Sequence, residues 1–210
     1  MLRKYLLGFG AFALAFVILS VSVLQSSSVS YSFASSAPTA PPVTNTPVPE
    51  IIYNLPFQGD ILPDSPFWIF KAMRDRVWYV LAKDPLKKAE LALLFSDKRL
   101  ESSRILFSNS KPDLALSTLT KGEKYLEAAM KNETEARDRG TDTSQFLVKL
   151  LTASLKHRQV IEENILPLAP EDAKPTIVQS EDYAKNTFKY VRDILNSRSI
   201  PVQENPFDGD

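Results

Sequence analysis

The chain has no cysteine, one histidine and only six glycines among 210 residues. Without cysteine there are no disulfides, no thiolate metal sites and no thiol nucleophiles. The low glycine content argues against phosphate-cradling loops, and neither a P-loop nor a Rossmann glycine pattern occurs. Basic and acidic residues balance at 25 each, so no global charge collects nucleic acid. We therefore expect no nucleic-acid partner.

Patterns for catalysis and metal binding are equally sparse. The single histidine, His157, lies in a helical stretch and has no carboxylate three or four residues away. A histidine–carboxylate metal pair on one helix would need that spacing. We predict that His157 is a satisfied or surface residue, and that the chain has no catalytic residue, metal site or cofactor. Two carboxylates brought together by tertiary contact, as glycosidases require, stay open as an alternative.

The N-terminus carries an export signature. Arg3 and Lys4 precede an uncharged apolar run from Tyr5 to Leu24. Twenty residues with a rise of about 1.5 Å each cover roughly 30 Å, enough to cross a bilayer once. The first part of the run also fits the shorter core of a signal peptide, and small residues suited to cleavage follow. Residues 1–24 are therefore a cleaved signal peptide or a retained anchor, and both place residues 38–210 outside the cytoplasm.

A spacer and a helical domain follow. Residues 25–61 are rich in Pro, Ser and Thr, which is typical of an extended spacer or a disordered linker. We assign residues 62–198 to the domain and residues 199–210 to a flexible tail. Prolines suited to first helical turns, glycine suited to a helix end and apolar residues at helical spacing predict an all-α antiparallel bundle. Its five helices are expected at 65–82, 85–107, 112–139, 144–166 and 171–197.

Acidic residues four positions before basic ones recur along these helices. Such pairs stabilise isolated helices by only about 0.2–0.5 kcal/mol each and are typical of solvated faces. We therefore interpret them as surface features rather than a site; they are Glu133 with Arg137, Glu135 with Arg139 and Glu181 with Lys185.

Several motifs occur in a fixed order at the start of the domain. Leu-Pro-Asp-Ser-Pro-Phe spans Leu62–Phe67, Asp84–Pro85 opens the next helix, and Ala89–Glu90–Leu91 lies within it. With a less exact Arg-Leu-Glu element at residues 99–101, this order resembles an uncharacterised bacterial family of exported helical domains over about residues 62–130. The resemblance implies an extracytoplasmic helical fold and no assigned activity.

The helix expected at 65–82 has two interpretations. Aromatic and basic side chains would suit a helix that rests on a lipid surface. Apolar residues on most sides of the helix favour instead a helix packed within the bundle. We favour the packed helix, with Arg74 and Arg76 forming a salt bridge to the following helix through Glu90. The residues expected to contact a partner or membrane are Phe67, Trp68, Arg74, Arg76 and Trp78.

Together these features predict a non-catalytic, extracytoplasmic interaction or accessory domain. It would be secreted, or tethered to the membrane by its N-terminal segment if that is not cleaved. Its expected partner is an unknown protein of the cell envelope. The alternatives are an envelope enzyme with paired carboxylates and a domain that docks on the membrane through helix 65–82.

Overall fold

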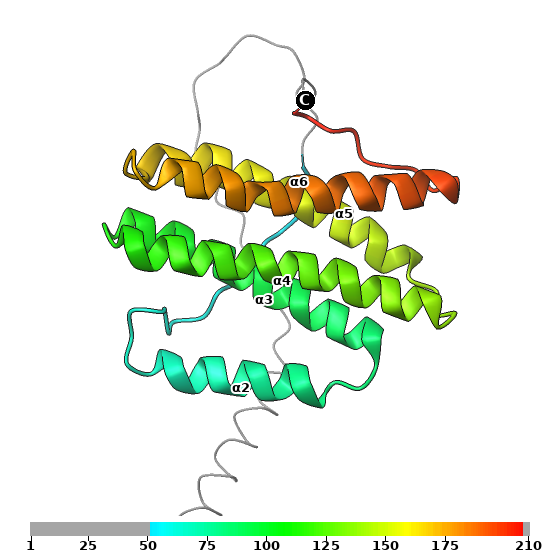
Figure 1. Ribbon diagram of the computed structural model, residues 1–210, viewed down its shortest axis with the longest axis horizontal. Helices are drawn as coiled ribbons and strands as arrows, with labels where there is room; N and C mark the ends of the chain where they lie inside the picture. The colour runs from blue at the N-terminus through cyan, green and yellow to red at the C-terminus, as the bar shows by residue number, and fades with distance from the viewer. Residues whose placement is uncertain (1–50, 208–210) are drawn as a thin grey trace, which may run out of the picture. The chain divides into compact units, whose positions relative to one another are not determined.

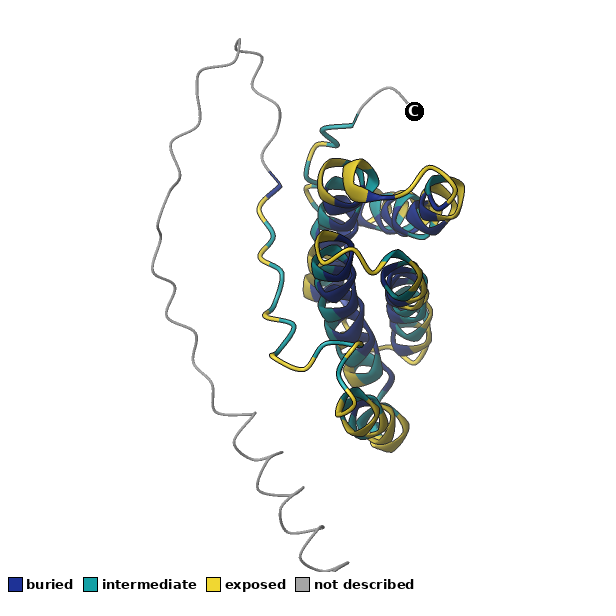
Figure 2. Ribbon diagram, turned by 90° about the vertical axis from the view of Figure 1, so that its left-hand side faces the viewer, coloured by how far each residue is buried: buried dark blue, intermediate teal, exposed yellow. Residues whose placement is uncertain are grey.

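The computed structural model describes residues 51–207, and within them all regular structure is helical. Figures 1 and 2 show three layers: α5 with α6, then α3 with α4, and α2 on the side of α3 and α4 opposite α5 and α6. The all-α prediction is confirmed. The helices are α2 (Trp68–Leu81), α3 (Pro85–Ser108), α4 (Pro112–Asp138), α5 (Ser144–Val160) and α6 (Lys174–Ser197). The apolar run Tyr5–Leu24 lies outside the described residues.

Most helix ends follow from local chemistry. The Asp84 side chain accepts the Leu86 N–H at 3.2 Å, and Pro85 occupies the first turn of α3. Gly140 ends α4 with a φ of +84°, a left-handed conformation that glycine adopts without strain. These predicted signals are confirmed by the geometry.

The helix predicted at 144–166 ends earlier than expected. α5 stops at Val160, and a π-helical turn (Ile161–Ile165) and a short 3₁₀ turn (Leu166–Leu168) follow. Pro167 has no N–H, and its ring clashes with the carbonyl four residues before it. The regular α-helical pattern therefore breaks ahead of the proline.

α3 and α4 pack closely because small residues line their contact. The Ser96 hydroxyl donates to the Gly122 carbonyl at 2.8 Å, and the Ser103 hydroxyl donates to the Ala115 carbonyl at 2.8 Å. A Cβ at Gly122 would lie 3.1 Å from the Cβ of Arg99. The glycine is therefore required by the short distance between the two helices.

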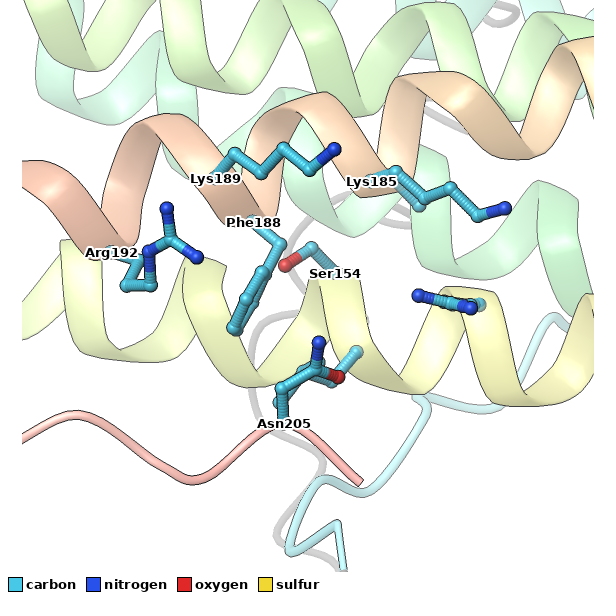
Figure 3. A pocket seen from close by; sticks show the side chains of 9 residues that line it. Ser154, Lys185, Phe188, Lys189, Arg192 and Asn205 are labelled. Atoms are coloured by element: carbon cyan, nitrogen blue, oxygen red, sulfur yellow. The ribbon is translucent and has the colours of Figure 1, made fainter. Parts of the chain in front are cut away.

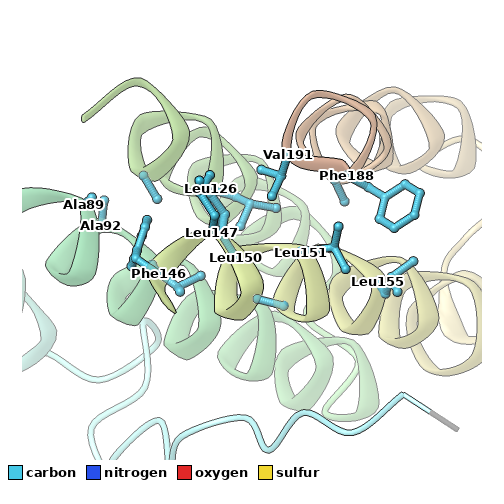
Figure 4. Packing of buried hydrophobic residues seen from close by; sticks show 14 of the residues in the cluster. Ala89, Ala92, Leu126, Phe146, Leu147, Leu150, Leu151, Leu155, Phe188 and Val191 are labelled. Atoms are coloured by element: carbon cyan, nitrogen blue, oxygen red, sulfur yellow. The ribbon is translucent and has the colours of Figure 1, made fainter. Parts of the chain in front are cut away.

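Two apolar clusters fill the bundle, and the larger one is shown in Figure 4. α3, α4 and α5 each contribute to both clusters, and each carries a buried ionisable residue between its two contributions: Asp97, Glu123 and His157. A polar layer thus divides the core where the helical spacing alone would place leucine or isoleucine.

The segments before α2 and after α6 also pack on the bundle. Ile51 is buried, and Tyr53 forms a hydrogen bond with α3. Val202 and Phe207 pack against the larger apolar cluster. The described parts of the predicted linker and tail, residues 51–61 and 199–207, therefore lie against the helices.

Candidate functional site

α2 turns its apolar face away from the bundle. Seven large apolar side chains on α2 and its N-cap are 48–69% exposed: Phe67, Ile69, Phe70, Met73, Val77, Val80 and Leu81. At 100° per residue they share an arc of about 160°. The expectation that this stripe is buried in the bundle is therefore wrong, although α2 does pack as one of the five helices. Monomeric soluble proteins rarely expose so continuous an apolar surface.

The side of α2 that faces the protein combines the polar Asp75 and Lys71 with half-buried aromatic side chains. Asp75 is the only buried residue of the helix and pairs with Arg74 at 2.9 Å. The Lys71 ammonium donates to the carbonyls of Gln58 and Ile61 at 2.6 and 3.0 Å. Burial, reinforced by nearby cations and opposed by Asp75, lowers the pKa of Lys71 to about 8. α2 thus differs from an ordinary bundle helix, because its one buried residue is an acid and its continuous aliphatic and phenylalanine stripe points outward.

Arg74 and Arg76 do not join α2 to α3 as predicted. Arg74 pairs with Asp75 on its own helix, while Arg76 and Glu90 are exposed. The predicted bridge is wrong because Asp75, not an arginine, takes the inward position. On the helical wheel, Arg76 borders one edge of the apolar arc, and Arg74, paired with Asp75, lies near the other edge between Leu81 and Phe67.

The remaining residues of the predicted contact set are divided between the two sides of the helix. Phe67 is exposed and belongs to the apolar arc. Trp68 and Trp78 are half-buried, with the cations of Lys71 and Arg74 at 4.9 and 5.1 Å from their ring centroids. The structure therefore adds aliphatic residues to the candidate surface, leaves Trp78 at its margin and places Trp68 on the opposite side of the helix.

The buried histidine lies between two carboxylates from different helices. His157 Nδ1 is 2.7 Å from Glu123 Oε1, and its Nε2 is 3.0 Å from Asp97 Oδ1. Tyr53 donates its O–H to the other oxygen of Asp97 at 2.6 Å. When the imidazole is protonated, each ring nitrogen carries a hydrogen and donates it to one of the two carboxylates. The prediction of a satisfied histidine is confirmed, and its partners come from tertiary contact.

Electrostatics favour the charged imidazole. Burial opposes the charge on His157, but the carboxylates and their hydrogen bonds outweigh burial and raise its pKa to about 10. Burial and the Asp97 carboxylate also raise the pKa of Tyr53. His157 is 0% exposed, and both of its nitrogens are occupied. The arrangement joins three helices and the N-terminal segment, and it leaves no imidazole nitrogen for a substrate.

Two other carboxylates are more buried than their spacing suggested. Glu133 is 0% exposed and accepts a hydrogen bond from Thr143 at 2.6 Å. Glu181 is also buried and lies 3.0 Å from Lys185; burial, followed by contact with Glu162, raises its pKa against the effect of Lys185. The prediction of solvated pairs is therefore wrong for these two acids and holds for Glu135, which is exposed.

A small basic pocket of about 60 Å³ lies between α5 and α6. Figure 3 shows Lys185, Lys189 and Arg192 along α6, with Ser154 on α5 and Asn205 from the C-terminal segment. Lys185 pairs with Glu181, and Arg192 pairs with Asp193 at 2.9 Å. Much of the positive charge is thus compensated within the protein.

Residues 51–207 hold neither a group of three or more metal-ligating side chains nor a helix long and apolar enough to span a membrane. Asp97 and Glu123 contact different nitrogens of the His157 ring. Their oxygens and the imidazole therefore do not surround a single point where a metal ion could bind.

The fold and the outward apolar helix define a class of all-α bundle domains with one exposed amphipathic helix. The chain belongs to the family described as a domain of unknown function, DUF5667, whose model matches residues 60–171. The resemblance seen in the sequence over residues 62–130 is thereby confirmed. No curated protein and no solved structure matches the chain significantly. The matched segment contains α2 to α5, and α6 follows it.

Proposed function

We propose that the protein is a non-catalytic, extracytoplasmic interaction domain whose contact surface is the outward apolar face of α2. The observation that carries this proposal is the orientation of α2, with seven large apolar side chains exposed and a buried aspartate on the opposite side. Exposing this surface to water is unfavourable, by about 25 cal/mol for each Å² that a partner would otherwise cover. A covering partner removes that cost.

The rest of the domain supports a scaffold role for this surface. The buried charged side chains of the core have partners within the protein, as His157 has Asp97 and Glu123, and Arg99 has the Phe95 carbonyl. An enzyme with paired carboxylates would need both acids to face a pocket. Glu162 and Glu181 contact each other near α6, but neither lines the pocket between α5 and α6. The export signature of the N-terminus motivates the extracytoplasmic location, with secretion and membrane tethering both open.

The lack of cysteine makes a direct test possible, because an introduced cysteine is the only thiol of the chain. Val77→Cys places the thiol on the apolar face of α2. Val178→Cys is the matched control on α6, since Val77 and Val178 are 48% and 45% exposed. Each variant is expressed as the full chain in the native host, and intact cells are treated with a maleimide that does not cross the cytoplasmic membrane. Each labelling rate is divided by that of the same variant unfolded in urea.

We expect the thiol of Val178→Cys to react in intact cells and the thiol of Val77→Cys to react much more slowly, because a partner covers α2. Equal normalised rates for the two variants would show that nothing covers α2 in the cell. Labelling of Val178→Cys only after lysis would contradict the extracytoplasmic location.

A further inference from the structure

Resting on the proposed function, we infer that the partner covering α2 is the surface of an anionic lipid bilayer. The first reason is the distribution of charge on the helix. Arg76 lies exposed at one edge of the apolar arc, and the exposed Lys83 follows the helix directly. The only acid of α2, Asp75, is buried on the opposite side. An apolar face with a cationic edge fits the boundary between acyl chains and anionic headgroups.

The second reason is the packing of the helix. An amphipathic helix at a bilayer surface directs its apolar side into the lipid and its polar side away from it. Here the opposite side is occupied by the protein itself, through the Lys71 hydrogen bonds to the preceding segment and the packing of Tyr79 against the larger apolar cluster. Tyr79 also accepts a hydrogen bond from Asn132 of α4 at 2.8 Å. The bundle thus holds α2 from this side and leaves the apolar side exposed.

The third reason is the chain that precedes the domain. The sequence predicts an apolar run at residues 5–24 that is long enough to cross a bilayer, and 26 residues lie between it and Ile51. Twenty-six residues reach at most about 90 Å even when fully extended. Where the run is retained as an anchor, the domain stays close to the bilayer. Tethering then makes even a weak surface contact effective.

The full chain reconstituted into vesicles tests this inference. Val77→Cys and Val178→Cys are each labelled with an environment-sensitive fluorophore. The vesicles are made of phosphatidylcholine alone or of phosphatidylcholine with phosphatidylglycerol, each with and without nitroxide-bearing lipid. We expect nitroxide lipid to quench the fluorophore at position 77 and not at 178, and the quenching at 77 to be stronger in the anionic vesicles. Adding Phe70→Asp should abolish it, and Arg76→Gln with Lys83→Gln should remove the preference for anionic lipid.

Equal quenching at the two positions, or none at 77, overturns the inference. Energy transfer between labels at position 77 on two copies, without lipid quenching, would identify a second copy of the chain as the partner and would also overturn it. If the thiol at position 77 is protected in cells but its label is unquenched in vesicles, the lipid inference fails and the proposed interaction function stands. If that thiol is unprotected in cells, the proposed function itself fails.

Discussion

The single histidine makes the stability of the domain depend on pH in a specific direction. The folded pKa of His157 is raised to about 10 from an ordinary value of 6.5. Between these values the folded protein retains one proton that the unfolded chain releases. The free energy of unfolding therefore falls as pH rises, and the contribution of His157 is fully present only below pH 6.5. One proton corresponds to about 1.4 kcal/mol per pH unit, or about 2 kcal/mol between pH 6.5 and 8.

Lys71 limits, at its upper end, the pH range over which the stability falls. Its folded pKa is lowered to about 8 from 10.5, so above pH 8 the unfolded chain holds the additional proton. That difference makes stability rise with pH and offsets the slope from His157. We therefore expect a decline from pH 6.5 to 8 and a flatter profile above it.

Two measurements check this reasoning. Urea unfolding followed by circular dichroism gives the free energy at each pH, and NMR of the untagged chain follows one imidazole, since the chain has one histidine. The ring signals should not titrate between pH 6 and 8. His157→Gln should remove the slope while costing about 3–5 kcal/mol, because a buried carboxylate loses its partner. Ring signals that titrate near pH 6.5, or a stability independent of pH, would refute the charged histidine.

Three substitutions test the buried hydrogen bonds and the helix packing by urea unfolding. Tyr53→Phe should lower the free energy of unfolding by about 1–3 kcal/mol, because Asp97 loses one hydrogen-bond donor. It should also expose residues 51–61 to proteolysis, and an unchanged cleavage pattern would argue against the Tyr53 contact. Thr143→Val should cost a similar amount by removing the hydroxyl that donates to Glu133, whereas a neutral result would place Glu133 in water. Gly122→Ala should destabilise by about 1–3 kcal/mol through overpacking of α3 against α4, and a stabilised variant would show that the helices can separate.

Local signals in the sequence predicted much of the fold. Pro85 and Pro112 start α3 and α4 at the expected residues, and Gly140 ends α4, because caps and φ preferences act over a few neighbouring residues. The π-helical turn after Val160 was missed, although Pro167 was recognised as a helix breaker. The proline disrupts the turn before it as well as ending the helix.

The orientation of α2 could not be read from periodicity. Spacing shows that Phe70, Met73 and Val77 share a face, but it does not show which way that face points. The consecutive apolar residues at its start suggested burial on all sides. Asp75, lying opposite that stripe, was the signal for an inward polar side, and it has meaning only once α3 supplies its surroundings.

The buried carboxylates escaped prediction for a related reason. Glu133 and Arg137 have the spacing of a surface ion pair, and only the approach of Thr143 across a turn shows that Glu133 is internal. Asp97 and Glu123 interrupt apolar stripes at positions that would suit leucine. That interruption was the available signal for a polar layer. Only the tertiary structure shows that Asp97 and Glu123 meet at His157.

The orientation of α2 is tested most directly by the stability of Phe70→Asp. Because Phe70 is 61% exposed, the charged side chain should change the free energy of urea unfolding by no more than about 0.5 kcal/mol. Leu93→Asp in the core serves as the positive control and should abolish the cooperative transition. A loss of about 3–5 kcal/mol at Phe70, as expected for a large core side chain, would show that α2 packs its apolar face inward and would contradict the account.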